Sequence, residues 1–251
     1  FKELDNGGPT GFDADDLMLK VGAYKEDGPM PQSIELKYQT REEVSNETYL
    51  GLTLQDFRAD PYRRYDASAD DTFRGENELF QLTHKIELAP SLSLTTIAYH
   101  HDFARNWYKL QGINAAGTGA SGDTGISSVL ADPVSYAAEY DLATGAASLD
   151  DSIVYRANRR AYYSEGVQTT LNWQTALGGL DHDLTLGLRV HEDEEDRFQE
   201  EDAYRLEGGR LILTTAGAAG SNANRISSGE AVALFLQDRV SLGKLTLTGG
   251  A

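Results

Sequence analysis

Apolar and polar residues alternate along most of this chain with a period of two. In VQTTLNWQTAL (167–177), the apolar Val167, Leu171 and Leu177 occupy one set of alternate positions, and mostly polar residues occupy the other. Successive side chains of a β-strand point to opposite faces, so this pattern predicts a strand with one apolar face. HDLTLGLRV (182–190) repeats the alternation, and the Gly-Gly pair between the two runs predicts a hairpin turn.

The same alternation recurs in other parts of the chain and predicts about eight antiparallel strands between residue 17 and residue 251. The apolar positions that define these runs are Leu17, Leu19 and Val21; Ile34, Leu36 and Tyr38; Phe80, Leu82 and Ile86; Val232, Leu234 and Leu236; and Leu245 and Leu247. In LSLTTIAYHHDF (92–103) the apolar phase shifts, so we expect either a bulge near Thr95 or a strand with mixed faces.

The connections between these runs alternate in length. Short turns are expected at 27–31, 89–91, 178–181 and 242–244, and long polar connections at 41–75, 105–163 and 193–229. Short turns at one end and long loops at the other are typical of an outer-membrane barrel. The predicted fold class is therefore all-β: an antiparallel transmembrane β-barrel segment with short periplasmic turns and long extracellular loops. A soluble acidic β-protein with inserted loops is the alternative.

Composition argues against several classes of function. The longest aliphatic block, AVALFL (231–236), is far below the ~20 residues that a membrane-spanning helix needs. A formal net charge of -18 opposes nucleic acid as a partner. The sequence has no cysteine, which removes thiolate nucleophiles and Cys-ligated metals. No Ser, His and Asp arrangement with a nucleophile context is visible, so we expect neither an enzyme nor a cofactor.

Four stretches carry a resemblance to a known family: SNETYLGLTLQDFRADPYRRY (45–65), AYHHDFARNWYKL (98–110), ANRRAYYSEGVQTTLNW (157–173) and GEAVALFLQDRVSLGKLTLTGG (229–250). They resemble TonB-dependent outer-membrane receptors, in the branch of ferric citrate and related iron-siderophore receptors. The resemblance implies a large barrel plugged by an N-terminal globular domain. No plug, TonB box or full set of strands is found here, so residues 1–251 are expected to form part of one barrel domain.

What the resemblance implies about function is active transport across the bacterial outer membrane. The expected ligand is a ferric chelate, either ferric citrate or a siderophore, and the energy would come from TonB through an N-terminal region. Outer-membrane lipid and lipopolysaccharide are the other expected partners. The alternatives are a TonB-dependent receptor for another nutrient, such as a glycan or cobalamin, and a soluble β-protein without transport.

Two clusters of arginine and tyrosine are the candidate ligand-binding residues. A guanidinium pairs with carboxylate or catecholate oxygens, and phenols stack and donate hydrogen bonds, so both suit an oxygen-rich anionic chelate. Both clusters are expected in loops at the long-loop end. The alternative is that the tyrosines form the interfacial girdle and the arginines contact lipopolysaccharide or neutralise acidic loops. The candidates are Arg58, Tyr62, Arg63, Arg64 and Tyr65 in the first cluster and Arg156, Arg159, Arg160, Tyr162 and Tyr163 in the second.

Other motifs favour structural interpretations. GTGASG (117–122) matches a dinucleotide-binding pattern by its letters but has no strand before it, so a flexible loop is expected. The adjacent His100 and His101 would face opposite sides of a strand and could not chelate one ion together. EDEEDRFQEED (192–202) lacks the ordered spacing of a calcium loop, and a solvated acidic loop is favoured over a cation site.

Two short helices are expected within the long connections. Thr53 and Asp56 have the spacing of a capping box, and Pro61 would end the helix that they begin. Asp132 and Pro133 form an N-cap and first-turn pair before VSYAAEYDL. Folded loops of this kind could close over a ligand.

Overall fold

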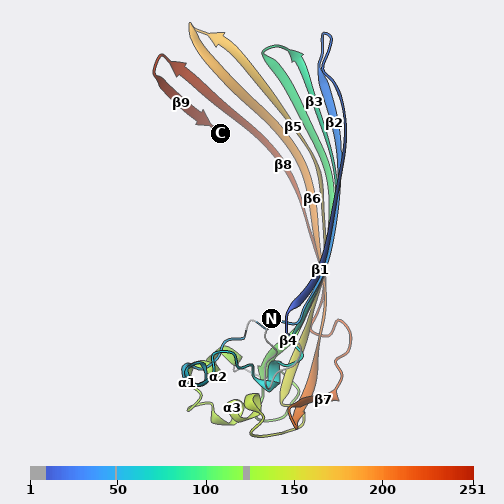
Figure 1. The fold of residues 1–251 in the computed structure, drawn as a ribbon, viewed down its shortest axis with the longest axis vertical. Helices are drawn as coiled ribbons and strands as arrows, with labels where there is room; N and C mark the ends of the chain where they lie inside the picture. The colour runs from blue at the N-terminus through green and yellow to red at the C-terminus, as the bar shows by residue number, and fades with distance from the viewer. Residues whose placement is uncertain (1–9, 49, 121–124) are drawn as a thin grey trace.

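The computed structural model describes residues 10–48, 50–120 and 125–251, and it places most of them in one strongly curved antiparallel sheet (Figure 1). The strands are β1 (Phe12–Lys25), β2 (Gln32–Ser45), β3 (Thr72–Ala89), β4 (Leu92–Ile113), β5 (Ile153–Leu177), β6 (Leu180–Glu207), β7 (Arg210–Thr215), β8 (Ala223–Leu242) and β9 (Leu245–Gly250). Eight strands follow in the order β1-β2-β3-β4-β5-β6-β8-β9, and β7 pairs with β6 outside this path. The all-β antiparallel prediction is confirmed, and the sheet is open within the described residues.

The register aligns the apolar positions of neighbouring strands into rows. One row runs through Val21, Leu36, Leu82, Ala98, Val167, Val190 and Val232, which are paired directly across adjacent strands. These side chains are not covered by a second layer. Leu186 and Leu188 on the same face are 43% and 48% exposed, which excludes a sandwich in which these leucines would be buried. The sheet therefore carries an uncovered apolar belt on one face, as expected of lipid-facing strands.

The four short turns were predicted correctly, and all lie at one end of the sheet (Figure 1). The long connections are shorter than expected because the strands continue well beyond the apolar belt. The β2–β3 connection is 46–71 rather than 41–75, and the β4–β5 connection is 114–152 rather than 105–163. In the third connection, strand β6 continues to Glu207. Polar strand residues beyond the belt have no apolar alternation to reveal them.

The phase shift in β4 produces a mixed face and not a bulge. Thr95 pairs regularly with Lys85 and Thr170, so no residue is inserted there. Leu94 lies on the face of the apolar belt, whereas Ile97 lies on the opposite face with Thr83 and Gln168 as paired neighbours. The register of β4 shifts instead near its two ends, between Glu87 and Ala89 of β3 and between Leu110 and Gly112.

Four short helices occupy the two long connections: α1 (Leu54–Ala59), η1 (Asp66–Ser68), α2 (Ile126–Ala131) and α3 (Ala137–Thr144). The predicted cap of α1 is confirmed, because the Thr53 side chain accepts from the Asp56 amide. The second prediction was wrong in part: Asp132 accepts from the Ser135 amide at 3.1 Å and caps a turn, while α3 begins only after Tyr136. No helix of the described residues is long and apolar enough to cross a bilayer.

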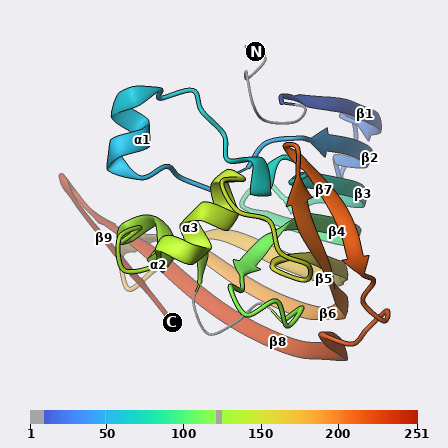
Figure 2. The same ribbon diagram turned by 90° about the horizontal axis from the view of Figure 1, so that it is seen from below.

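The helices gather on one side of the sheet at the end opposite the short turns (Figures 1 and 2). Here the molecule has a true hydrophobic core, built where the two long connections meet β4, β5 and β6. Its buried members are Ala67, Leu110, Ile113, Leu142, Ala143, Ile153, Tyr155 and Leu206. We call this region the loop end. Its packing fixes the surroundings of both arginine and tyrosine clusters.

Candidate ligand-binding site

The second arginine and tyrosine cluster lies on strand β5 and not in a loop, contrary to expectation. Its neighbour in the sheet is the acidic run 192–202, which also belongs to a strand, β6, so the solvated-loop prediction for that run was wrong. The two segments pair in antiparallel register, with Arg156 opposite Glu201 and Ala157 opposite Glu200. Cross-strand pairs of opposite charge stabilise a sheet, which explains why two charged runs extend it beyond the belt.

Each arginine of this cluster has a carboxylate partner on β6. Arg156 donates through Nε to Glu201 at 2.8 Å, and the Nη1 atom of Arg160 lies 2.7 Å from Glu195. Arg159 lies 2.7 Å from Glu200 and has a side chain that is 49% exposed. The structure thus shows that the acidic run neutralises much of the charge of the cluster.

Glu195 is also bound by a second arginine. Hydrogen bonding from Arg197 is the largest influence on Glu195 and, with Tyr162 and the charge of Arg160, outweighs the opposing effect of burial and lowers the pKa of Glu195 to about 2. The carboxylate is therefore ionised at neutral pH and holds two guanidinium groups in place.

The two tyrosines of the cluster lie on opposite faces of β5. Tyr162 stacks on Phe103 with ring centroids 5.8 Å apart, and its hydroxyl accepts from Arg105 at 3.4 Å and from Arg160 at 3.3 Å. Tyr163 stacks on His100 and donates to Glu192 at 2.7 Å. Tyr162 is thus grouped with the arginines, and Tyr163 is directed to an acidic partner on the face of the apolar belt.

In the first cluster, two candidates are buried. The Arg64 guanidinium donates to the carbonyl oxygens of Ser68 and Asn46 at 3.0 and 2.7 Å, and only 3% of the residue is exposed. Tyr65 is 1% exposed, and burial together with its hydrogen bond to Asp56 raises its pKa to about 12. These two side chains hold connection 46–71 in its fold.

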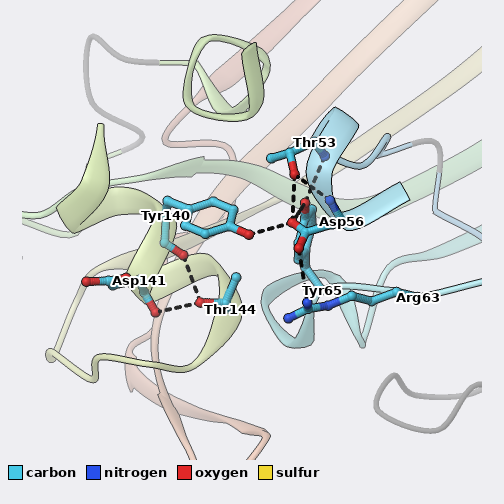
Figure 3. A network of polar contacts seen from close by, with 7 residues as sticks. All are labelled: Thr53, Asp56, Arg63, Tyr65, Tyr140, Asp141 and Thr144. Carbon is cyan, nitrogen blue, oxygen red and sulfur yellow. Dashed lines mark hydrogen bonds and ion pairs between the residues drawn. The ribbon is translucent and has the colours of Figure 1, made fainter. Parts of the chain in front are cut away.

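The other three candidates of this cluster lie nearer to solvent. Arg58 is exposed in the last turn of α1, and Tyr62 is exposed just after that helix. Arg63 is partly exposed, its guanidinium lies 3.2 Å from Asp56, and it sits over the Tyr65 ring at 5.5 Å (Figure 3). The first cluster is therefore divided between a buried half and an exposed half.

A hollow of about 340 Å³ on strands β3 to β6 collects arginines from three of these strands. Its floor includes Ala104 and Ala161, which pair directly across β4 and β5, so only methyl groups fill the space between longer side chains. The lining consists of Arg74, Glu76, Ala104, Arg105, Asn106, Arg159, Arg160, Ala161, Asp196 and Phe198. We call this site the arginine hollow.

Sequence reasoning missed Arg74 and Arg105, which also line the hollow. Among the described residues, neither forms an ion pair with a carboxylate. Since side chains alternate along a strand, Arg74 and Arg159 lie on the face of the apolar belt, whereas Arg105 and Arg160 are directly opposite each other on the other face, with Tyr162. Like charges placed directly opposite are destabilising unless an anion lies between or beside them. Arg105 and Arg160 can thus hold an oxygen-rich anion on the face opposite the belt.

The histidines and the glycine motif add no site. His100 lies between Glu165 and Asp102, whereas His101 bonds Asn77 on the opposite face. Within the described ranges, no group of three or more His, Cys, Asp or Glu side chains is arranged to hold a metal ion. The GTGASG motif lies partly outside the described residues.

Comparisons with known proteins place this sheet in a family. The family profile "TonB dependent receptor-like, beta-barrel" matches residues 29–251. The ferric citrate transporter FecA in its unliganded form superposes with a TM-score of 0.64 and 19% identity, over 98% of this chain and 29% of that one. The open form of the ferric-catecholate import receptor Fiu from E. coli K12 gives a TM-score of 0.56 and 10% identity, over 99% of this chain and 44% of that one.

At these identities, the two structures show a shared fold, and the chain spans less than half the length of either. A comparison with curated protein sequences gives no match. Members of the matched family are bacterial outer-membrane receptors and not enzymes. The alternation, the open antiparallel sheet and the family match over residues 29–251 together show that this chain belongs to the TonB-dependent receptors, as a portion of their β-barrel.

Proposed function

We propose that the receptor containing this chain imports a ferric chelate, either ferric citrate or a siderophore, with energy supplied through TonB. The chain forms part of one barrel domain in this proposal, and its apolar belt contacts outer-membrane lipid. The observation that carries the proposal is the pair Arg105 and Arg160, which lie directly opposite each other beside Tyr162 on the face opposite the apolar belt, in a protein of net charge -18. FecA is a ferric citrate transporter and Fiu is a ferric-catecholate import receptor, and these two proteins supply the ligand class by analogy.

Charge makes the pair Arg105 and Arg160 suited to an anion. The field of an acidic protein opposes the approach of an anion, so capture needs a local concentration of positive charge. Arg160 is partly neutralised by Glu195, whereas Arg105 forms no ion pair with a carboxylate among the described residues. Arg105 therefore adds positive charge on the face opposite the belt.

The proposed contact set follows from these positions. We assign Arg105 and Arg160 to chelate capture, with Tyr162 as a hydrogen-bonding neighbour. Arg74 and Arg159 lie on the belt face and suit contact with lipopolysaccharide. Arg58, Tyr62 and Arg63 remain proposed contacts on the exposed part of connection 46–71. Arg64 and Tyr65 have folding roles in this proposal, Arg156 is held by Glu201, and Tyr163 contributes to the interfacial girdle.

The test replaces the two arginines assigned to capture. Arg105→Gln combined with Arg160→Gln should weaken binding of an anionic ferric chelate by about a hundredfold or more, since each charge-assisted contact is worth roughly 1.5–3 kcal/mol. Affinity is measured by titrating the full-length receptor in membrane vesicles with ferric citrate, a ferric catecholate and a ferric hydroxamate. Uptake of radioactive iron in cells provides the transport readout.

The control is Arg239→Gln, which removes an exposed arginine of β8 near the short-turn end of the sheet. This variant should bind the chelates like the unmodified receptor. If the double variant keeps full affinity for every ferric chelate while remaining folded, the anion-capture role of Arg105 and Arg160 is wrong. Binding of a glycan or cobalamin in place of any chelate would support the other nutrient classes.

A further inference from the structure

Asp56 receives donors on both carboxylate oxygens. Its Oδ2 atom accepts from the hydroxyls of Thr53 at 2.8 Å, Tyr65 at 2.6 Å and Tyr140 at 2.5 Å (Figure 3). Its Oδ1 atom lies 3.2 Å from an Arg63 guanidinium nitrogen. Only 7% of Asp56 is exposed, so this carboxylate is charged, nearly buried and fully occupied by protein donors.

These donors come from two different connections. Thr53, Arg63 and Tyr65 belong to connection 46–71, whereas Tyr140 belongs to α3 in connection 114–152. The Tyr65 and Tyr140 rings also meet edge to face, with centroids 6.2 Å apart. Asp56 therefore joins segments that are 84 residues apart in the sequence at one carboxylate.

The position of α1 depends on this joint. A helix of six residues is too short to be stable alone, and its Leu54, Phe57 and Arg58 side chains are exposed, so little packing holds it from elsewhere. Helix α3, in contrast, buries Leu142 and Ala143 in the core of the loop end. The hydroxyl of Tyr140 thus ties a weakly packed helix to a firmly packed one.

We infer that Asp56 couples the two long connections through α1 and α3, so that these two helices open, close and exchange with solvent as one body. The physical reason is the cost of separating them. Withdrawal of α3 would remove the Tyr140 hydroxyl from a nearly buried charge, and a hydrogen bond to a charged group is among the strong ones. Residues of either connection that contact a ligand would then move with both.

If the receptor transports a chelate as proposed, the coupling links ligand contact in one connection to the other, and this consequence rests on the proposed function. Arg63, a proposed ligand contact, is held by the same carboxylate as Tyr140 of the second connection. A chelate that displaces or recruits Arg63 therefore changes the bonding of Asp56. This change alters the hydrogen bond between Asp56 and Tyr140 and so the stability of α3. Asp56 is in this view a positioning residue that acts through Arg63 and Tyr140.

The variant that tests the coupling is Tyr140→Phe, which removes one hydroxyl and leaves the ring packing in place. Amide hydrogen exchange is measured in the full-length receptor in membrane vesicles, without ligand. We expect exchange in α1 to accelerate by about tenfold or more, since one charge-assisted hydrogen bond is lost from the structure that protects it. Asp56→Asn should give the same direction of change in α1 and in α3.

A matched control is Tyr136→Phe, which makes the same chemical change in the same connection, at a tyrosine that is not among the hydroxyl donors to Asp56. It should leave exchange in α1 unchanged. If Tyr140→Phe accelerates exchange only within 125–152 while α1 keeps its protection, α1 does not depend on the bond between Asp56 and Tyr140, and the inference fails. An equal acceleration of α1 in Tyr136→Phe would also overturn it.

Ligand experiments separate this inference from the proposed function. With ferric citrate or another chelate that binds, α1 and α3 should gain protection together in the unmodified receptor, but separately in Tyr140→Phe. If no ferric chelate binds, the proposed function fails, whereas the exchange result without ligand still decides the coupling.

Discussion

The middle of the sheet and the loop end are built by opposite solutions to the same problem of burying apolar surface. In the middle, Leu186, Leu188 and Val190 stay exposed on the protein, and only lipid can cover them. At the loop end, Leu142, Ala143 and Tyr155 are almost fully buried by protein. The belt part of the sheet therefore needs a bilayer or detergent to be stable. The loop end is stabilised by its own hydrophobic core and can stand in water.

The largest expected loss of stability comes from a cavity in the core of the loop end. Leu142→Ala should destabilise the loop end by about 2–5 kcal/mol, since a buried leucine leaves a cavity when truncated. Amide exchange in α3 and at the start of β5 should rise steeply in the full-length receptor. Leu186→Ala, in the belt, should leave exchange at the loop end unchanged. A loop end that tolerates Leu142→Ala would mean that its core contributes little.

The next effect tests the lipid face. Leu188→Arg should cost roughly 2–4 kcal/mol near the middle of the bilayer, because a charge there must leave water. Thr170→Arg places the same charge on the opposite face of the sheet and should cost far less. The measurement is the yield of heat-resistant folded receptor in the outer membrane. Equal losses in both variants would contradict the assignment of faces.

Low pH should destabilise the loop end by protonating the Asp56 carboxylate. Burial favours the neutral form of Asp56, but hydrogen bonds from Tyr140, Tyr65 and Thr53 and the charge of Arg63 outweigh it and lower its pKa below the ordinary 3.8. A lowered pKa contributes stability that is present above the unfolded value and is lost as pH falls through the folded value. Protection of α1 should therefore be constant from neutral pH to about pH 4 and decline below it. A decline that begins near pH 6 would point to another group.

The smallest effect is expected at the rim of the arginine hollow. The Arg159 side chain is 49% exposed, whereas that of its partner Glu200 is only 9% exposed, so solvent screens one side of the pair. Arg159→Gln removes the charge but keeps an N–H donor for Glu200, so unfolding of the receptor in denaturant should change by about 1 kcal/mol or less. A loss of several kcal/mol would show that the pair belongs to the core of the loop end and not to its surface.

The sequence was sufficient for the belt but not for the loop end. Alternation and Gly-Gly turns report local geometry, so the hairpin of β5 and β6 could be predicted with its correct turn. Between the belt and the core of the loop end, residues 192–202 of β6 are mostly charged and the alternation ends, which is why this run was expected to be a loop. The charge complementarity between that run and β5 was the available signal.

The site was harder to predict because its parts are far apart in the chain. Arg105 and Arg160 come from two strands, and only the register brings them opposite each other. Arg64 has the same composition signal as Arg63 and yet is buried, since carbonyl oxygens of its own connection bind it. Composition can indicate the chemistry of such a cluster, but it cannot show which members face solvent.

The length of β5 sets how far the receptor reaches from the cell. Its belt part, 167–177, rises about 25 Å when strands tilt by about 45°, which matches the apolar band of outer-membrane barrels. The remaining part, 153–166, then stands roughly 30 Å outside the hydrocarbon at the same tilt. The extended strands thus act as a stalk that lifts the arginine hollow and the loop end clear of the lipid headgroups, where a dilute nutrient first meets the cell.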